Sequence, residues 1–200
     1  MQDHLSWFNE KASIWDTVAT EETRRRLHEV ILSLGIAVNS TVLDVATGTG
    51  LLIPWLREAA GPGGRLVAID FSPEMIVRAR AKFPDGVEFL VADVHSIDFQ
   101  DNTFDEVICN SAFPHFANKT QAMAEMARVL KKGGRLTICH PATREELNEF
   151  HSKLGGTVGG DMLPPDYEMS AMAEAAGLIG TAIVDGPEYY VLTAWKGKRQ

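Results

Sequence analysis

Three aspartates, Asp44, Asp70 and Asp93, stand at or next to the ends of short apolar runs in the first half of the sequence. A carboxylate placed there can accept hydrogen bonds from both hydroxyls of a ribose, which is the chemistry we predict for Asp70. Asp93, with the N–H of Val94 beside it, can accept from the amino group of an adenine. Together the three residues predict a site for a nucleoside ligand at one edge of a sheet.

Small residues follow the first aspartate, in the run Ala46-Thr47-Gly48-Thr49-Gly50. Such residues let the backbone approach a ligand closely, and the N–H groups of the helix expected next point at the same place. Ala46 suits this turn if it keeps a negative φ. The competing interpretation is the dinucleotide fingerprint G-x-G-x-x-G, but Ile53 stands where its third glycine should be.

Histidines supply the candidates for proton transfer. His115 follows the run Asn110-Ser111 in a loop expected at the same sheet edge, and imidazole titrates near neutrality, so we predict that it is a general base. His140, after the next strand, is the second candidate, and the alternative for His115 is a core histidine bonded to a backbone carbonyl. The spacing of His140, His151 and Asp161 matches no compact set of metal ligands, so we predict no metal site.

The elements that must position these residues alternate between strands and helices. Apolar runs at residues 42–45, 65–69, 87–91, 105–109 and 135–139 predict five parallel strands with helices on both faces of the sheet. Two alternating runs, 179–184 and 189–195, are joined by a short turn and predict a terminal antiparallel hairpin. The fold class predicted is α/β, a doubly wound, Rossmann-like sheet of seven strands.

Composition limits the class of protein. The 200 residues are 45% hydrophobic and carry a formal charge of −8, which favours one domain (1–200) and opposes a nucleic-acid groove. No apolar run reaches the ~20 residues of a membrane span. Two cysteines, Cys109 and Cys139, form no C-x-x-C pair and suit a cytoplasmic protein.

Two segments lie outside the alternating pattern. Residues 1–35 are unusually aromatic at their start, and we interpret them as a helical cap that packs either on the sheet or over the ligand. Residues 140–165 form a long connection, which predicts a lid over the substrate. A capping box at Thr143 opens its helix, which we expect Leu147, Phe150 and Leu154 to anchor, and two glycine pairs follow.

The motif Asp44-x-Ala46-x-Gly48-x-Gly50 resembles the first motif of class I S-adenosylmethionine-dependent methyltransferases, which most often have glycine where Ala46 stands. Residues 101–105 and 128–136 are similar to the region around the fourth and fifth strands of this family, especially in the methyltransferase type 11 group that contains the quinone-biosynthesis C-methyltransferases. The similarity covers residues 5–140. It implies a cytoplasmic methyltransferase, a monomer or homodimer, that moves a methyl group from S-adenosylmethionine to a small molecule and releases S-adenosylhomocysteine.

On this resemblance Asp44 acts near the methionine amino group, and Phe71 and Met75 form apolar walls for adenine. The expected site residues fall into three groups. The cofactor would be held by Asp44, Ala46, Gly48, Gly50, Asp70, Phe71, Met75, Asp93, Val94 and Asn110; the substrate by Ser111, His115, His151 and Asp161; and proton transfer would use His115 and His140. An NAD-dependent oxidoreductase and a cofactor-binding module without turnover are the two alternatives.

Overall fold

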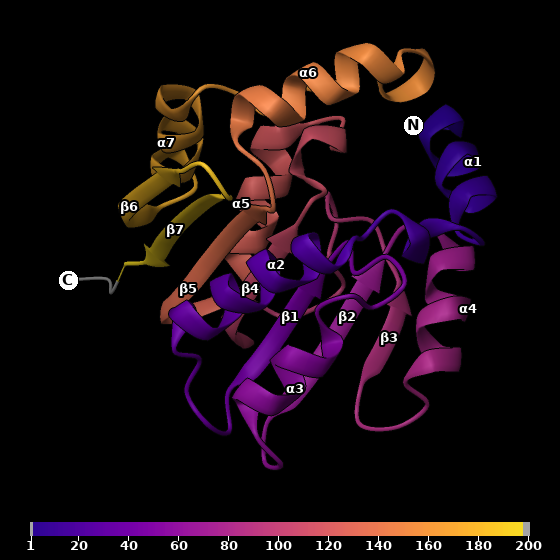
Figure 1. Cartoon of the computed structure of the whole chain (residues 1–200). Coiled ribbons are helices and arrows are strands. Elements are labelled where there is room, and N and C mark those ends of the chain that lie inside the picture. Colours follow the sequence, from indigo (N-terminus) through magenta and orange to yellow (C-terminus); the bar gives the residue numbers. More distant parts are fainter. Residues whose placement is uncertain (1, 198–200) are drawn as a thin grey trace.

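The computed structural model describes residues 2–197, and within that range seven strands form one mixed sheet (Figure 1). Their order is β3-β2-β1-β4-β5-β7-β6. The strands are β1 (Thr41–Val45), β2 (Arg65–Asp70), β3 (Glu88–Val91), β4 (Phe104–Asn110), β5 (Leu130–His140), β6 (Leu178–Asp185) and β7 (Tyr190–Lys196).

Strands β1 to β5 pair in parallel, and β7 pairs antiparallel with both β5 and β6, which confirms the predicted fold class. The chain winds from β1 outward to β3 and then returns to β4 on the other side of β1. The direction of winding therefore reverses between β1 and β4, where sheets of this kind bind ligands. β5 begins earlier than residue 135, because Leu130 already pairs with Phe104 ahead of a register shift.

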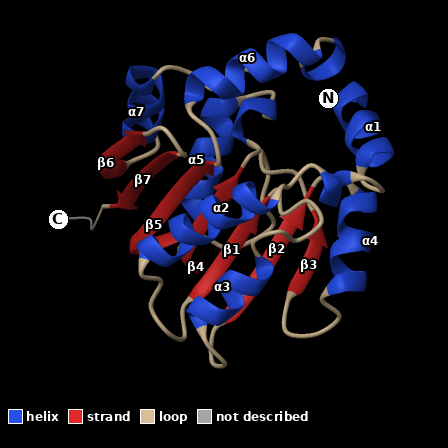
Figure 2. Cartoon of the chain, in the orientation of Figure 1, coloured by secondary structure: helices blue, strands red, loops and turns tan. Residues whose placement is uncertain are grey.

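Helices cover both faces of the sheet (Figure 2). One face packs against α2 (Glu21–Leu34), α3 (Ile53–Ala60) and α4 (Pro73–Lys82), and the other against α5 (Lys119–Val129) and α7 (Asp166–Ala175). Every strand of the sheet centre is therefore buried on both sides, as in other doubly wound sheets. None of the helices in residues 2–197 is long and apolar enough to cross a membrane.

Local signals place the helix ends where the sequence predicts them. The side chains of Ser72 and Thr143 accept hydrogen bonds from the N–H groups of Met75 and Glu146, and Thr143 forms the expected capping box. Gly35 ends α2 in the left-handed conformation, at φ 57°. These caps hold the helices whose first turns face the carboxyl ends of the strands.

The remaining elements gather above those carboxyl ends. They are α1 (Gln2–Lys11), the 3-10 turn η1 (Trp15–Thr17), η2 (Phe113–His115), α6 (Arg144–Leu154) and η3 (Gly156–Val158). In Figure 1, α6 runs above the sheet edge toward the N-terminal end of α1. The N-terminal segment and the 140–165 connection thus meet above the same part of the sheet.

Candidate active site

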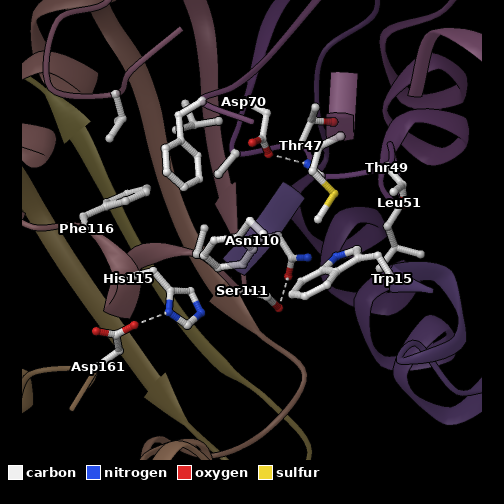
Figure 3. Close-up of a pocket in the computed structure, with 18 of the residues that line it drawn as sticks. Trp15, Thr47, Thr49, Leu51, Asp70, Asn110, Ser111, His115, Phe116 and Asp161 are labelled. Carbon is white, nitrogen blue, oxygen red and sulfur yellow. Dashed lines mark hydrogen bonds and ion pairs between the residues drawn. The ribbon is translucent and has the colours of Figure 1, made fainter. Parts of the chain in front are cut away.

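A cavity of about 490 Å³ lies over the switch point between β1 and β4. Its floor comes from the ends of β1, β2 and β4, and its walls come from η1, η2, α1 and α6 (Figure 3). Most of the wall is aromatic or aliphatic, with a few polar groups, which is the usual make-up of a site for a small organic ligand. Of the predicted site residues it is lined by Ala46, Gly48, Asp70, Phe71, Met75, Asp93, Val94, Asn110, Ser111, His115, His151 and Asp161.

Asp70 holds the small-residue turn in place. Its Oδ2 accepts a hydrogen bond from the Gly48 N–H at 2.8 Å, and its Oδ1 accepts one from the Ser72 N–H at 2.9 Å. Burial raises the pKa of Asp70 to about 6, although both backbone hydrogen bonds favour the charged form. The carboxylate therefore links the ends of β1 and β2 and faces the cavity.

The turn itself is strained at Ala46, which adopts φ 55°. The expectation of a negative φ at this position was wrong. The left-handed conformation is costly for any residue with a Cβ, and such strain collects at functional sites. Gly48 is also left-handed, at φ 57°. A Cβ atom at this position would lie 3.4 Å from Trp15 Nε1, so a side chain there would enter the cavity.

Two residues of the motif lie beneath the cavity and do not line it. Asp44 is buried and accepts a hydrogen bond from the Thr47 hydroxyl at 2.7 Å. Burial raises the pKa of Asp44 to about 7, and the nearby Asp70 adds to that rise. Gly50 makes room for the Phe83 ring, which would stand 2.9 Å from a Cβ at this position. Both residues shape the turn from below.

Asp93 is held by a neighbour that the sequence analysis did not single out. Its Oδ1 accepts hydrogen bonds from the backbone N–H and the ring Nδ1 of His95, at 2.9 and 2.6 Å. The other ring nitrogen of His95 accepts from the Asn118 N–H at 3.1 Å. This chain of bonds ties the loop after β3 to the start of α5 and fixes the carboxylate at the cavity wall.

The N-terminal segment closes the side of the cavity opposite the sheet. The Asp16 carboxylate accepts a hydrogen bond from the Thr49 hydroxyl at 2.6 Å and pairs with the Lys82 ammonium. Phe8 is buried, and it packs with Met75 and beside Trp15 in a small aromatic cluster. The sequence analysis missed Asp16, because no local pattern shows that η1 rests on the glycine-containing turn.

Asp161 and His115, which are 46 residues apart in the chain, form a hydrogen-bonded pair. The His115 Nδ1 lies 2.7 Å from Asp161 Oδ2. A carboxylate can only accept, so the Nδ1–H donates and the Nε2 of a neutral ring is left as an acceptor. Figure 3 shows the far edge of the His115 ring turned into the cavity, toward Asn110 and Ser111. His115 therefore presents a basic nitrogen to a ligand.

Two more histidines contact Asp161. The His4 Nε2 lies 3.0 Å from Asp161 Oδ2, and the His151 Nδ1 donates to the Asp161 backbone carbonyl at 2.6 Å. Burial lowers the pKa of His151, although its hydrogen bond to the Asp161 carbonyl acts in the opposite direction. Burial raises the pKa of Asp161, but the hydrogen bonds from His115 and His4 outweigh it, so the pKa lies below its usual value.

His140 is placed differently from the sequence expectation. Its side chain is fully buried, it does not line the cavity, and burial together with His115 and His151 lowers its pKa to about 3. Neither of its ring nitrogens has a hydrogen-bond partner among the described residues. A ring that stays neutral and lies outside the cavity is a poor candidate for the base, so the geometry favours His115 alone.

The helix α6 is also held differently from the sequence expectation. Phe150 and Leu154 are 52% and 50% exposed, so they do not anchor the helix on the sheet as expected. The buried residue of α6 is His151, and the Asn148 side chain binds both backbone groups of Leu163. The reason is position: α6 lies over the cavity, where Phe150 forms part of the mouth.

The end of β4 adds a second strained residue. Ser111 adopts φ 54°, and its hydroxyl donates to Asn110 Oδ1 at 3.1 Å. Both side chains line the cavity between the small-residue turn and His115.

Comparison with known proteins shows clear relatives. Residues 43–138 match the family described as "Methyltransferase domain". A demethylmenaquinone methyltransferase of Chlorobaculum tepidum is 31% identical, over 90% of this chain and 76% of that protein. A ubiquinone/menaquinone biosynthesis C-methyltransferase of Enterobacter sp. (strain 638) is 30% identical, over 80% of this chain and 72% of that protein.

Solved structures of methyltransferases have a similar fold. A SAM-dependent methyltransferase from Aquifex aeolicus superposes with a TM-score of 0.76 at 25% identity, over 92% of this chain and 98% of that one. Other curated relatives are longer, and the chain spans between 39% and 63% of three of them.

Proposed function

The chain belongs to the class I S-adenosylmethionine-dependent methyltransferases, in the group that includes the quinone-biosynthesis C-methyltransferases, and on that premise we propose that it methylates a small-molecule acceptor. The observation that carries the proposal is the placement of the His115–Asp161 pair in the same cavity as Asp70 and Gly48. The residues proposed to bind the cofactor, Asp70 and Gly48, thus share one cavity with the pair proposed for proton transfer. A binding module without turnover does not need a proton-transfer pair.

The residues present suit S-adenosylmethionine. Asp16, Asp70, Asp93 and Asp161 face the cavity, against Lys119 as the one ammonium group among its described lining residues. This excess of carboxylates favours a cationic sulfonium. The open space at Gly48 lets a ligand approach the turn closely.

We assign the adenosine end to five residues. Asp70 would accept from the ribose hydroxyls, and Asp93 and Val94 would meet the adenine edge. Phe71 and Met75 would cover the ring, and Asn110 would lie near the methionine end, as the sequence resemblance implies.

Methyl transfer requires little chemical activation by the protein. When bound, the cofactor supplies a methyl group that its sulfonium already activates, so alignment and exclusion of water do most of the work. His115 would take the proton of the acceptor on Nε2, and Asp161 would keep its ring in the required tautomer. Ser111 and His151 would orient the acceptor, and α6 with the 155–160 loop would serve as its lid.

The choice of acceptor is also a proposal. The two relatives above are named for quinone biosynthesis, so a short-chain demethylmenaquinol is the first compound to test. We also propose that the protein acts in the cytoplasm, where its two buried free thiols would stay reduced. The NAD alternative loses its support, because the family and the terminal hairpin both differ from those of a dinucleotide enzyme.

Calorimetry and turnover test the proposal together. We expect S-adenosylhomocysteine to bind the wild type and NAD not to bind. His115→Gln should lower kcat by at least ~100-fold, the usual contribution of a general base, with S-adenosylhomocysteine affinity unchanged within about twofold. Binding of NAD instead would refute the cofactor, and a His115→Gln variant with wild-type kcat would remove the base.

A further inference from the structure

We propose that His4 is a positioning residue: it docks α1 on Asp161, so that the His115 base is fully aligned only when the N-terminal helix is closed over the cavity. The proposal rests on the proposed function of His115. It adds to that function a residue 157 positions away from its partner in the chain. On this proposal, undocking of α1 would both let the acceptor enter and release the base from its aligned position.

The geometry at Asp161 carries the first step. His4 Nε2 lies 3.2 Å from Oδ1 and 3.0 Å from Oδ2, while His115 Nδ1 lies 2.7 Å from the same Oδ2. Both rings must donate, since a carboxylate has no proton to give. One carboxylate is therefore held from two sides, by a residue of α1 and by the proposed base.

Partial burial strengthens the hydrogen bonds to Asp161. The side chains of His4, Asp161 and His115 are 24%, 15% and 13% exposed. Hydrogen bonds to a charged group in such surroundings are stronger than those on an open surface. Loss of the His4 bond would leave Asp161 free to turn away from the His115 Nδ1–H.

The second step concerns how α1 docks on the rest of the molecule. It is 10 residues long, and a helix of that length is marginally stable by itself in water. Phe8 is its buried apolar residue and packs with Met75, Trp15 and Phe71, and the Asn9 side chain accepts one hydrogen bond from the Ser72 hydroxyl at 2.6 Å. The His4–Asp161 contact adds to this docking near the start of the helix, so its loss should let α1 undock more often.

The third step is that α1 also touches the base directly. The Phe8 ring packs edge-on against the His115 ring, with centroids 5.2 Å apart and an interplanar angle of 74°. Undocking of α1 would therefore release His115 on one side and Asp161 on the other. It would also separate α1 from η3, the turn that follows α6.

Three variants and two measurements that need no acceptor test this. His4→Phe removes the donor, His4→Gln keeps an N–H at a similar reach, and His28→Phe is the matched control. His28 stacks on Trp55, with centroids 5.2 Å apart, and does not line the cavity. The measurements are hydrogen exchange in residues 3–12 and the nitrogen NMR shifts of the His115 ring, which report its tautomer.

In His4→Phe we expect exchange in residues 3–12 to rise about tenfold, the effect of losing one charge-assisted bond. The His115 ring should change from the Nδ1–H form to a mixture of tautomers. His4→Gln and His28→Phe should match the wild type. Asp161→Asn removes the charge and one of the two acceptor oxygens of the same contact, so it should also speed exchange in α1.

Turnover gives the last readout. His4→Phe should lower kcat by about five- to tenfold, less than removal of His115, and leave S-adenosylhomocysteine affinity unchanged. Wild-type exchange and tautomer in His4→Phe would overturn the proposal, as would a His4→Gln variant that behaves like His4→Phe. Because exchange and NMR need no acceptor, they decide the role of His4 even if the methyl-transfer proposal fails.

Discussion

Replacement of Asp70 by asparagine should separate cofactor binding from folding. The carboxylate accepts one backbone N–H on each oxygen, from Gly48 and from Ser72. Asparagine keeps one acceptor and turns a donor toward the other N–H. It also removes the charge that we expect the ribose hydroxyls to bind.

The expected size follows from these bonds. A hydrogen bond to a charged group contributes about 1.5–3 kcal/mol, so loss of one such bond to the ligand should weaken S-adenosylhomocysteine binding about 10- to 150-fold. Folding should suffer much less. Burial raises the pKa of Asp70 from the ordinary aspartate value of 3.8 to about 6, so its charge opposes folding by on the order of 3 kcal/mol above pH 6.

The stability of the protein should therefore depend on pH through Asp70. The folded state holds the proton more tightly than the unfolded chain, so the wild type loses stability as the pH rises from about 4 to about 6. Asp70→Asn lacks this loss but leaves one backbone N–H without an acceptor, so its melting temperature should stay close to that of the wild type at pH 7.5. At pH 4, where only the lost hydrogen bond remains, the variant should melt below the wild type.

Calorimetry at pH 7.5 and thermal unfolding across this pH range make the test, with Asp98→Asn as the matched control. Asp98 is exposed and does not line the cavity. Affinity within twofold of the wild type would refute the ribose assignment. A melting temperature that falls in step with the affinity would show that Asp70 acts through the fold.

Three further predictions concern the small-residue turn and can be measured by urea or thermal unfolding. Gly50→Ala should lower the free energy of unfolding by about 2–4 kcal/mol, because φ is 86° there and the new Cβ would stand 2.9 Å from the Phe83 ring; no loss would mean that the ring moves freely. Ala46→Gly should raise it by up to about 1 kcal/mol, since glycine relieves the left-handed strain at φ 55° and gives back part of that gain as unfolded-state entropy; a net loss would contradict the strain argument. Asp44→Asn should stabilise the protein above pH 7 and not at pH 4, because burial raises the pKa of Asp44 to about 7; a gain that is independent of pH would exclude a buried charge as its cause.

The sequence by itself determined the elements and their order. Alternation of apolar runs predicts the five parallel strands and the terminal hairpin, and capping residues such as Ser72 and Thr143 predict where helices begin. Asp70 and Asp93 were placed at the cavity because parallel strands bring their carboxyl ends to one edge. These signals are local, since each depends on neighbours a few residues away in the chain.

Only the tertiary structure decided which side chains meet above that edge. His4, His115 and Asp161 come from three distant segments, and no local pattern relates them. The same holds for the burial of His140 and the exposure of Phe150, which depend on where α6 lies over the cavity. Long-range packing sets these contacts, because the position of each helix depends on the whole surface it covers and not on its own sequence.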